Sequence, residues 1–214
     1  MNPIVEPVPD SLLFDTSQRC SIEQLLALRA AGFRGGVRTV TFSAAPDPSD
    51  ITAAEVEDFM AAGLGLMVYQ RVRNPGWLPS AALGEADAVV LLAKVAAAGY
   101  LAGGSLWDDL EGIGGVGGAT VEYANAKAGA VKAAGYAPGE YVGFEVPLTG
   151  EQLFRDLAAS CYWRAPGNIP DVEGRGYALV QVAENVPVAG VLVDVSVARA
   201  DRLGGRASWM RNSS

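Results

Sequence analysis

Residues 60–64 read Met-Ala-Ala-Gly-Leu, and three other segments of the chain, 29–33, 97–100 and 133–136, follow the same pattern. In each segment alanine precedes a single glycine, and a large apolar residue follows. This pattern is typical of the end of a helix, because glycine readily adopts the left-handed conformation that follows the last turn. The four glycines lie 31, 36 and 36 residues apart, which is the length of one strand–helix unit. The spacing therefore predicts several strand–helix units in succession.

Helix starts agree with this spacing. Three residue pairs have the capping-box separation, namely Ser21 with Gln24, Thr52 with Glu55, and Thr149 with Gln152. We expect helices at 22–31, 52–62, 80–98, 119–134 and 150–159. Short apolar runs of strand type are expected at 11–15, 34–41, 65–71, 103–109, 140–146, 160–164, 177–182 and 190–195. The last two strands have no convincing helix between or after them.

Strands that alternate with helices favour a parallel sheet with right-handed crossovers. We therefore predict an α/β fold, an irregular TIM-like β/α barrel of about five β/α units followed by three strands with few helices. One domain is expected to span residues 1–214, with an N-terminal extension at 1–10 and a C-terminal tail at 200–214. An open, doubly wound sheet is the alternative.

Composition excludes several classes of protein. Half of the residues are hydrophobic and 19% are charged, which indicates a globular chain with a large core and excludes disorder and coiled coil. The apolar runs are interrupted well before the roughly 18 residues that a membrane-spanning helix needs. With 16 Lys and Arg against 24 Asp and Glu, the net charge of −8 argues against a nucleic-acid partner.

The chain contains no histidine, which excludes Ser-His-Asp and Cys-His catalysis and nearly all zinc sites. The two cysteines, Cys20 and Cys161, do not form a disulfide framework, so we expect free, buried thiols. The first residues lack the basic and apolar regions of a secretory signal. We expect a protein made in the cytoplasm that another process releases if it works outside. Carboxylates must carry most of any chemistry.

Acidic residues lie at the ends of several predicted strands, where the chemistry of a β/α barrel takes place. They are Asp15 at the end of the first strand, Asp108, Asp109 and Glu111 at the end of the fourth, Glu145 at the end of the fifth, and Asp194 at the end of the eighth. Asp109 and Glu111 share one side of an extended strand, roughly 6–7 Å apart at about 3.3 Å per residue.

Carboxyl groups this close repel one another, so at least one pKa rises. One group then stays protonated as a general acid while another is ionised. Cleavage of a glycosidic bond needs that division. The alternative is structural: these acids cap helices, hold an ion or face water. A hard cation such as Ca²⁺ or Mg²⁺ held by Asp15, Asp109, Glu111 and Asp194 is one form of that alternative.

Aromatic and amide residues accompany the acids at other strand ends, namely Tyr69, Gln70, Trp163 and Gln181. Sugar rings stack on aromatic side chains, and their hydroxyls pair with amides and carboxylates. Each of these residues alone is more often part of the core or rim. Their convergence with the acids favours substrate binding, to which we expect Glu145 and Asp108 to contribute.

Three motifs together carry a family resemblance, Phe14-Asp15-Thr16-Ser17, Asp109-Leu110-Glu111, and Gln181 followed by Val-Ala-Gly-Val-Leu-Val-Asp-Val-Ser-Val at 188–197. In this order they resemble the glycoside hydrolase family 25 muramidases and a neighbouring glycoside-hydrolase-like family of uncharacterised barrel proteins. The resemblance runs from residue 11 to about 200. It implies that Glu111 is the proton donor and that Asp109, Asp15 and Asp194 shape the charge around it. It also implies peptidoglycan glycan strands as the partner, with no cofactor and no metal.

The chain departs from the muramidases at Glu145, where relatives tend to have an aromatic or small residue, and at Asp108, an extra charge. The glycines at 112–117 also fit G-x-G-x-x-G, the dinucleotide fingerprint. However, Glu145 follows the last of them by 28 residues rather than about 20, and the preceding acids would repel a pyrophosphate. We expect a flexible loop beside the acidic side chains instead.

A second hypothesis is a barrel without catalytic activity, since a fold does not fix a function. The missing signal, the net negative charge and the extra carboxylates would suit a glycan-binding or structural component of a bacteriophage virion, in its tail or capsid, among other virion proteins. The geometry separates the two hypotheses. An enzyme needs Glu111 and an acidic partner in an open groove, whereas a scaffold can have that groove filled.

Overall fold

The structure, a computed structural model, describes residues 3–212. Seven consecutive strands run parallel: β2 (Leu12–Thr16), β3 (Gly35–Val40), β4 (Gly65–Gln70), β5 (Ser105–Asp109), β6 (Ala137–Val142), β7 (Cys161–Arg164) and β8 (Leu179–Val188). β9 (Val191–Ala198) runs antiparallel between β8 and β2. Because β4 also pairs with β5, the eight strands close into a barrel. The predicted irregular barrel is confirmed, and the open sheet is excluded.

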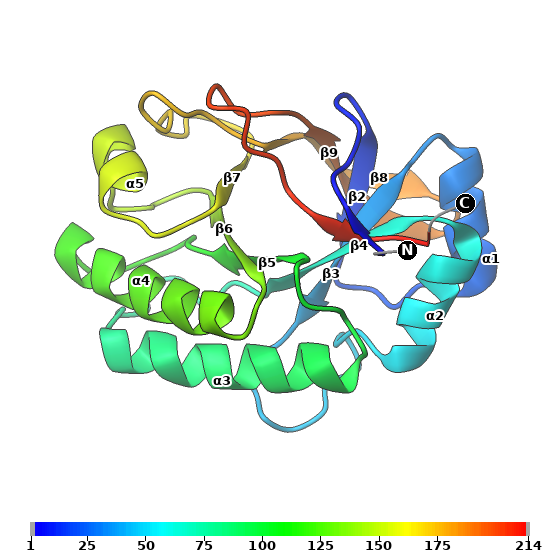
Figure 1. The fold of residues 1–214 in the computed structure, drawn as a ribbon, viewed down its shortest axis with the longest axis horizontal. Helices are drawn as coiled ribbons and strands as arrows, with labels where there is room; N and C mark the ends of the chain where they lie inside the picture. The colour runs from blue at the N-terminus through cyan, green and yellow to red at the C-terminus, as the bar shows by residue number, and fades with distance from the viewer. Residues whose placement is uncertain (1–2, 213–214) are drawn as a thin grey trace.

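Five helices cover the outside of the barrel (Figure 1): α1 (Ile22–Ala30), α2 (Ala53–Ala62), α3 (Ala81–Ala97), α4 (Gly117–Ala133) and α5 (Gly150–Arg155). Within residues 3–212 no helix follows α5, so loops alone connect the last strands. None of the described helices is long and apolar enough to cross a membrane. Cys20 and Cys161 are free and buried, as expected.

The helix ends follow the sequence pattern closely. Gly32, Gly63, Gly99 and Gly135 all have positive φ, between 68° and 107°. Ser21 and Thr149 form complete capping boxes. Thr52 caps α2, but the side chain of Glu55 does not return to it. Glu55 instead forms a buried ion pair with Arg38 on β3, so the third capping box is only half formed.

The ends of the chain contribute to the fold. β10 (Trp209–Met210) pairs with β4, and β1 (Ile4–Val5) pairs with β10. Trp209 is buried against β3 and β4, where a Cβ on Gly35 or Gly65 would lie within 2.6 Å of its ring. The segment expected to be a C-terminal tail therefore closes the end of the barrel at which β3 and β4 begin.

Strand β6 differs most from its expected position, since it covers 137–142 rather than 140–146. Its first residues include Pro138 and Gly139, which are typical of loops. Gly139 is needed because Trp107 on β5 packs directly over it. The shift places Glu145 three residues beyond the strand.

Candidate active site

Seven of the ten site residues expected from the sequence line one hollow of about 270 Å³ where the parallel strands end. They are Asp15, Tyr69, Asp109, Glu111, Trp163, Gln181 and Asp194. An adjoining hollow, also of about 270 Å³, shares Asp15, Tyr69 and Asp194 and continues along Ser17 and Gln18. We refer to the two together as the acidic groove. It is open, as an enzyme requires.

The other three residues lie outside the acidic groove. Asp108 and Gln70 are direct neighbours of Asp109 and Tyr69, and successive residues of a strand face opposite sides of a sheet. Asp108 therefore faces the helices and forms an ion pair with Lys127 of α4. Gln70 donates a hydrogen bond to the carbonyl of Asp87 on α3.

Glu145 is exposed in the turn after β6, with a φ of 56°. Its neighbour Phe144 lines the groove, but Glu145 does not. The expectation that Glu145 binds substrate came from placing this strand too far along the sequence.

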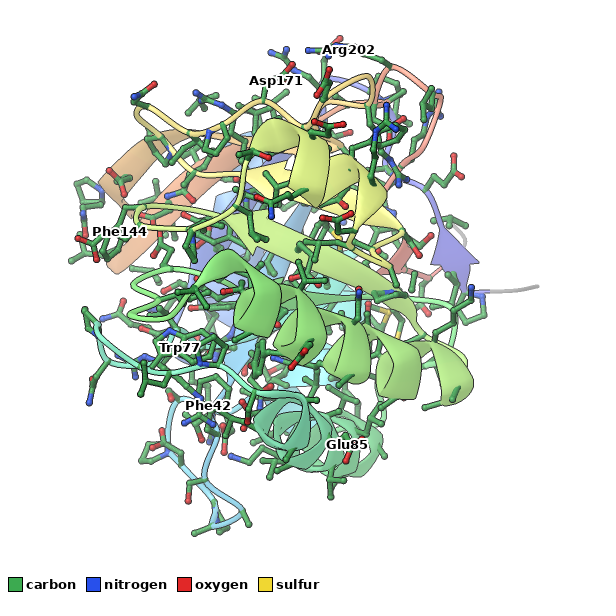
Figure 2. The ribbon with its side chains drawn as sticks, turned by 90° about the vertical axis from the view of Figure 1, so that its left-hand side faces the viewer. Phe42, Trp77, Glu85, Phe144, Asp171 and Arg202 are labelled. Carbon is green, nitrogen blue, oxygen red and sulfur yellow. The ribbon has the colours of Figure 1, made fainter. Side chains whose placement is uncertain are left out.

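Glu111 is half-buried in the turn that follows β5, so the chain is no longer extended where Glu111 follows Asp109. Its backbone N–H donates to Asp109 Oδ1 at 3.0 Å, and its Oε1 accepts from the N–H of Phe144 at 3.4 Å. Trp77 Nε1 donates to the Glu111 carbonyl at 2.9 Å. Figure 2 shows Trp77 and Phe144 on the same side of the molecule, and together they hold this turn from two loops.

Burial raises the pKa of Glu111. The hydrogen bond from the N–H of Phe144 lowers this pKa, whereas the negative charges of Glu184 and Asp194 raise it further. Burial also raises the pKa of Asp109 well above its usual range, with the charge of Glu111 as the next cause. Asp109 is only 6% exposed, whereas Glu111 is half-buried. Of these two carboxyl groups with raised pKa values, Glu111 is the more accessible to a ligand.

Asp15 and Asp194 face each other as register partners on β2 and β9. Burial and then the charge of Asp194 raise the pKa of Asp15 well above its usual range. The carboxylate of Asp194 is held by Gln181 Nε2 at 3.1 Å and by the N–H of Asn185 at 2.7 Å. One aspartate is thus favoured in its neutral form beside a second that is fixed in place.

Sequence reasoning missed several residues of the groove. Tyr141 on β6 donates to Gln181 Oε1 at 3.0 Å and packs against Trp163 with ring centroids 4.7 Å apart. Tyr141 is the register partner of Asp109 on the neighbouring strand, but a tyrosine within an expected strand gives no chemical signal in the sequence. Glu184 lies where β8 continues past its expected end and its pairing with β9 is irregular. No local sequence pattern predicts such an irregularity.

The aromatic residues form the floor of the groove. Trp163 contacts Tyr69 edge-on with centroids 6.4 Å apart and donates its Nε1 to Ser196 at 3.0 Å. Trp163 is only 2% exposed, so its ring supports the groove and has no free face on which a sugar could stack. Tyr69 is the more accessible ring.

The glycine segment after β5 is held against the loop after β4. Gly76 donates to the carbonyl of Gly112 at 2.8 Å, and Gly114 donates to that of Trp77 at 2.9 Å. A Cβ on Gly114 would lie 2.7 Å from the Gly76 carbonyl oxygen. The glycines therefore allow the backbones of the two loops to approach each other closely.

The described residues contain no group of three or more Cys, Asp or Glu side chains arranged to hold a metal ion. The cation alternative for Asp15, Asp109, Glu111 and Asp194 therefore gains no support. What the groove provides is several carboxyl groups, three of them with raised pKa values, beside aromatic and amide side chains.

Solved structures share this fold. The Tat-secreted protein Rv2525c of Mycobacterium tuberculosis, in complex with L-tartrate, is 20% identical with a TM-score of 0.66, over 92% of this chain and 98% of that one. A muramidase from Acremonium alcalophilum is 15% identical with a TM-score of 0.62, over 89% and 94%. The autolysin LytC from Streptococcus pneumoniae, in complex with a synthetic peptidoglycan ligand, is 15% identical with a TM-score of 0.62, over 88% of this chain and 46% of that one.

At these identities the muramidases share the fold alone, so the resemblance to family 25 is not specific to that family. No curated protein matches the chain. None of the structures above is described as a virion component, so that hypothesis gains no support. A family model for the Rv2525c-like, glycoside hydrolase-like domain matches residues 26–172, more than half of the sequence. The chain therefore belongs to the Rv2525c-like glycoside hydrolase-like domain family.

Proposed function

We propose that this protein hydrolyses glycosidic bonds in the glycan strands of bacterial peptidoglycan, with Glu111 as the general acid. The observation that supports this most is the position of Glu111. It is a half-buried carboxyl group with a raised pKa, open to a groove that contains four further acidic residues of the barrel strands, Asp15, Asp109, Glu184 and Asp194. Glycosidic cleavage needs one protonated carboxyl group beside an ionised one.

In the proposed reaction Glu111 gives its proton to the oxygen of the scissile bond as that bond breaks. Positive charge develops on the sugar ring, and a carboxylate close to the ring stabilises it. A water molecule then bonds to the sugar carbon and gives up one proton, which restores the protonated form of Glu111. Asp194 suits this role, because Gln181 and Asn185 fix its carboxylate across the groove. Asp109, which accepts the backbone N–H of Glu111, orients the turn that carries the acid.

Peptidoglycan as the substrate is supported by what the structural relatives act on or bind. One is a muramidase, and LytC is an autolysin seen with a synthetic peptidoglycan ligand. The groove itself suits a glycan, since carboxylates, amides and Tyr69 lie along two joined hollows. These are the partners that sugar hydroxyls and apolar ring faces require.

The test is release of reducing ends from purified peptidoglycan of several bacterial sources, with the products identified by mass spectrometry. We expect new reducing sugars that accumulate with time and enzyme. Binding to the same peptidoglycan without any release would refute hydrolysis and leave a glycan-binding barrel. A thermal melt on the same sample establishes that the protein is folded.

A Gly143→Ala variant is expected to lose activity by roughly 100-fold, the effect of a misplacement of about 1 Å. A Cβ at this position would lie 1.9 Å from Glu111 Oε1, so the acid must move. The matched control is Gly129→Ala on α4, where an added Cβ meets nothing within 4 Å. Initial rates of both variants, with melting curves, check the prediction. Equal rates for Gly143→Ala and wild type would show that the position of Glu111 is unimportant.

A further inference from the structure

A second hollow lies at the opposite end of the barrel from Glu111, and arginines line it. Its volume is about 490 Å³, and it forms where α1 and α2 end and where β2 begins. Arg29 comes from the last turn of α1, Arg34 from the segment before β3, and Arg211 from the segment after β10. We refer to it as the arginine hollow. It shares no residue with the acidic groove.

The positive charge of the arginine hollow is poorly compensated. Among residues 3–212, none of Arg29, Arg34 and Arg211 forms an ion pair, and Asp10 is the one acidic residue in the wall. Burial lowers the pKa of Arg211, and the charges of Arg29 and Arg34 lower it further. In a chain with a net charge of −8, three guanidinium groups have gathered here rather than beside the many available carboxylates.

The arginines are held in place by contacts that leave donors free. Arg29 Nη1 donates to the carbonyl of Ala62 at 2.7 Å, and Gly63 leaves the space for it, since a Cβ there would lie 2.8 Å from that nitrogen. Arg211 lies over the Trp209 ring at 5.7 Å. The carboxyl ends of α1 and α2 offset part of the charge. In the part of the chain that the structure describes, the guanidinium groups of Arg34 and Arg211 make no hydrogen bond.

We propose that the arginine hollow binds a phosphate group. Guanidinium groups present paired N–H donors that match two oxygens of one phosphate, and charge-assisted hydrogen bonds of this kind are short and strong. The volume leaves room for the molecule that carries the group. That carrier is either a small phosphate ester or an anionic polymer with repeated phosphates, because the same donors recognise both.

The test is a titration of the full chain with inorganic phosphate at low ionic strength, followed by NMR at the arginine side chains. We expect saturable binding with a Kd below about 1 mM, and weaker binding in high salt. A parallel titration with long-chain polyphosphate separates the two carriers. If polyphosphate binds much more tightly per phosphate than inorganic phosphate does, the natural ligand is a polymer. If the two bind equally per phosphate, the hollow recognises an isolated phosphate group.

The Arg34→Gln variant and the Arg34→Gln/Arg211→Gln double variant are expected to raise this Kd by at least about fivefold. Arg155→Gln is the matched control, since Arg155 is highly exposed and, within residues 3–212, its one ion pair is with Glu151 on its own helix. Arg34 is exposed, so its single variant keeps the test valid if the double variant is unstable. The absence of saturation up to about 10 mM phosphate, or an equal loss in the Arg155 control, would overturn the proposal. The outcome is independent of hydrolysis at Glu111.

Discussion

Glu111→Gln is expected to lower kcat for glycan hydrolysis by roughly 100- to 10,000-fold, the usual contribution of a general acid. The amide has nearly the same shape, and its oxygen can still accept the N–H of Phe144, which the carboxylate accepts at 3.4 Å. What it lacks is the proton that the scissile oxygen requires. KM should therefore change little while kcat falls, as measured by initial rates of reducing-sugar release.

The matched control for this variant is Glu145→Gln. Glu145 is an exposed glutamate in the turn after β6, outside the acidic groove, so the same change from carboxyl to amide there should leave the rate within about twofold of wild type. A Glu111→Gln protein that stays folded and keeps its rate would remove Glu111 from the mechanism. A rate that falls equally in both variants would point to net charge rather than to proton transfer.

Lys127→Met is expected to lower the free energy of unfolding by about 3–5 kcal/mol, the cost of leaving a buried charge without its partner. Lys127 and Asp108 form an ion pair with side chains only 2% and 5% exposed. Glu140 lies beside them. Burial, and next the charge of Asp108, raise the pKa of Glu140 well above its usual range, and the charge of Lys127 lowers it. Without the ammonium group, two carboxyl groups would remain buried together.

For a domain of this size the loss corresponds to a fall in Tm of roughly 6–20 °C, which calorimetry would detect. Lys132→Met, an exposed lysine on the same helix, is the matched control and should change Tm by little. The double variant Lys127→Met/Asp108→Asn should recover part of the loss, because it removes the stranded charge. A Tm for Lys127→Met equal to that of the control would show that the pair does not stabilise the fold.

The order of strands and helices could be predicted because glycines mark the helix ends. Gly32, Gly63, Gly99 and Gly135 adopt the positive φ that their neighbours could adopt only at a cost, so the local sequence alone locates them. The irregular last third could be predicted because no convincing helix pattern lies between or after the apolar runs at 177–182 and 190–195. The closure of the barrel then placed Asp15, Asp109 and Asp194 at one end.

The errors at the site have two physical causes. Alternation along a strand already separates Asp108 from Asp109 and Gln70 from Tyr69, so those two could have been assigned to the helix layer from the sequence. The position of Glu145 could not be assigned from the sequence, because Pro138 and Gly139 are typical of loops and the start of β6 is therefore not recognised. The ion pair of Arg38 with Glu55, which replaces a capping contact, depends on packing between distant segments.

The contacts of Trp209 and Glu184 also depend on tertiary structure. Trp209 closes the barrel because Gly35 and Gly65 leave room for its ring, and these residues are far apart in sequence. Glu184 reaches the acidic groove from a stretch of β8 where the pairing with β9 is irregular. Neither the hydrophobic periodicity nor a short sequence motif predicts such a contact.

The most direct test of Glu111 as the acid is the pH titration of its carboxyl carbon by NMR, with the signal assigned by its absence in Glu111→Gln. We predict a midpoint above the ordinary value of 4.5, because burial raises this pKa. Since the acid acts only when protonated, hydrolysis should fall as the pH rises through the same midpoint. A midpoint at or below 4.5 would contradict the account, since Glu111 would then be no better a proton donor than a carboxyl group in water.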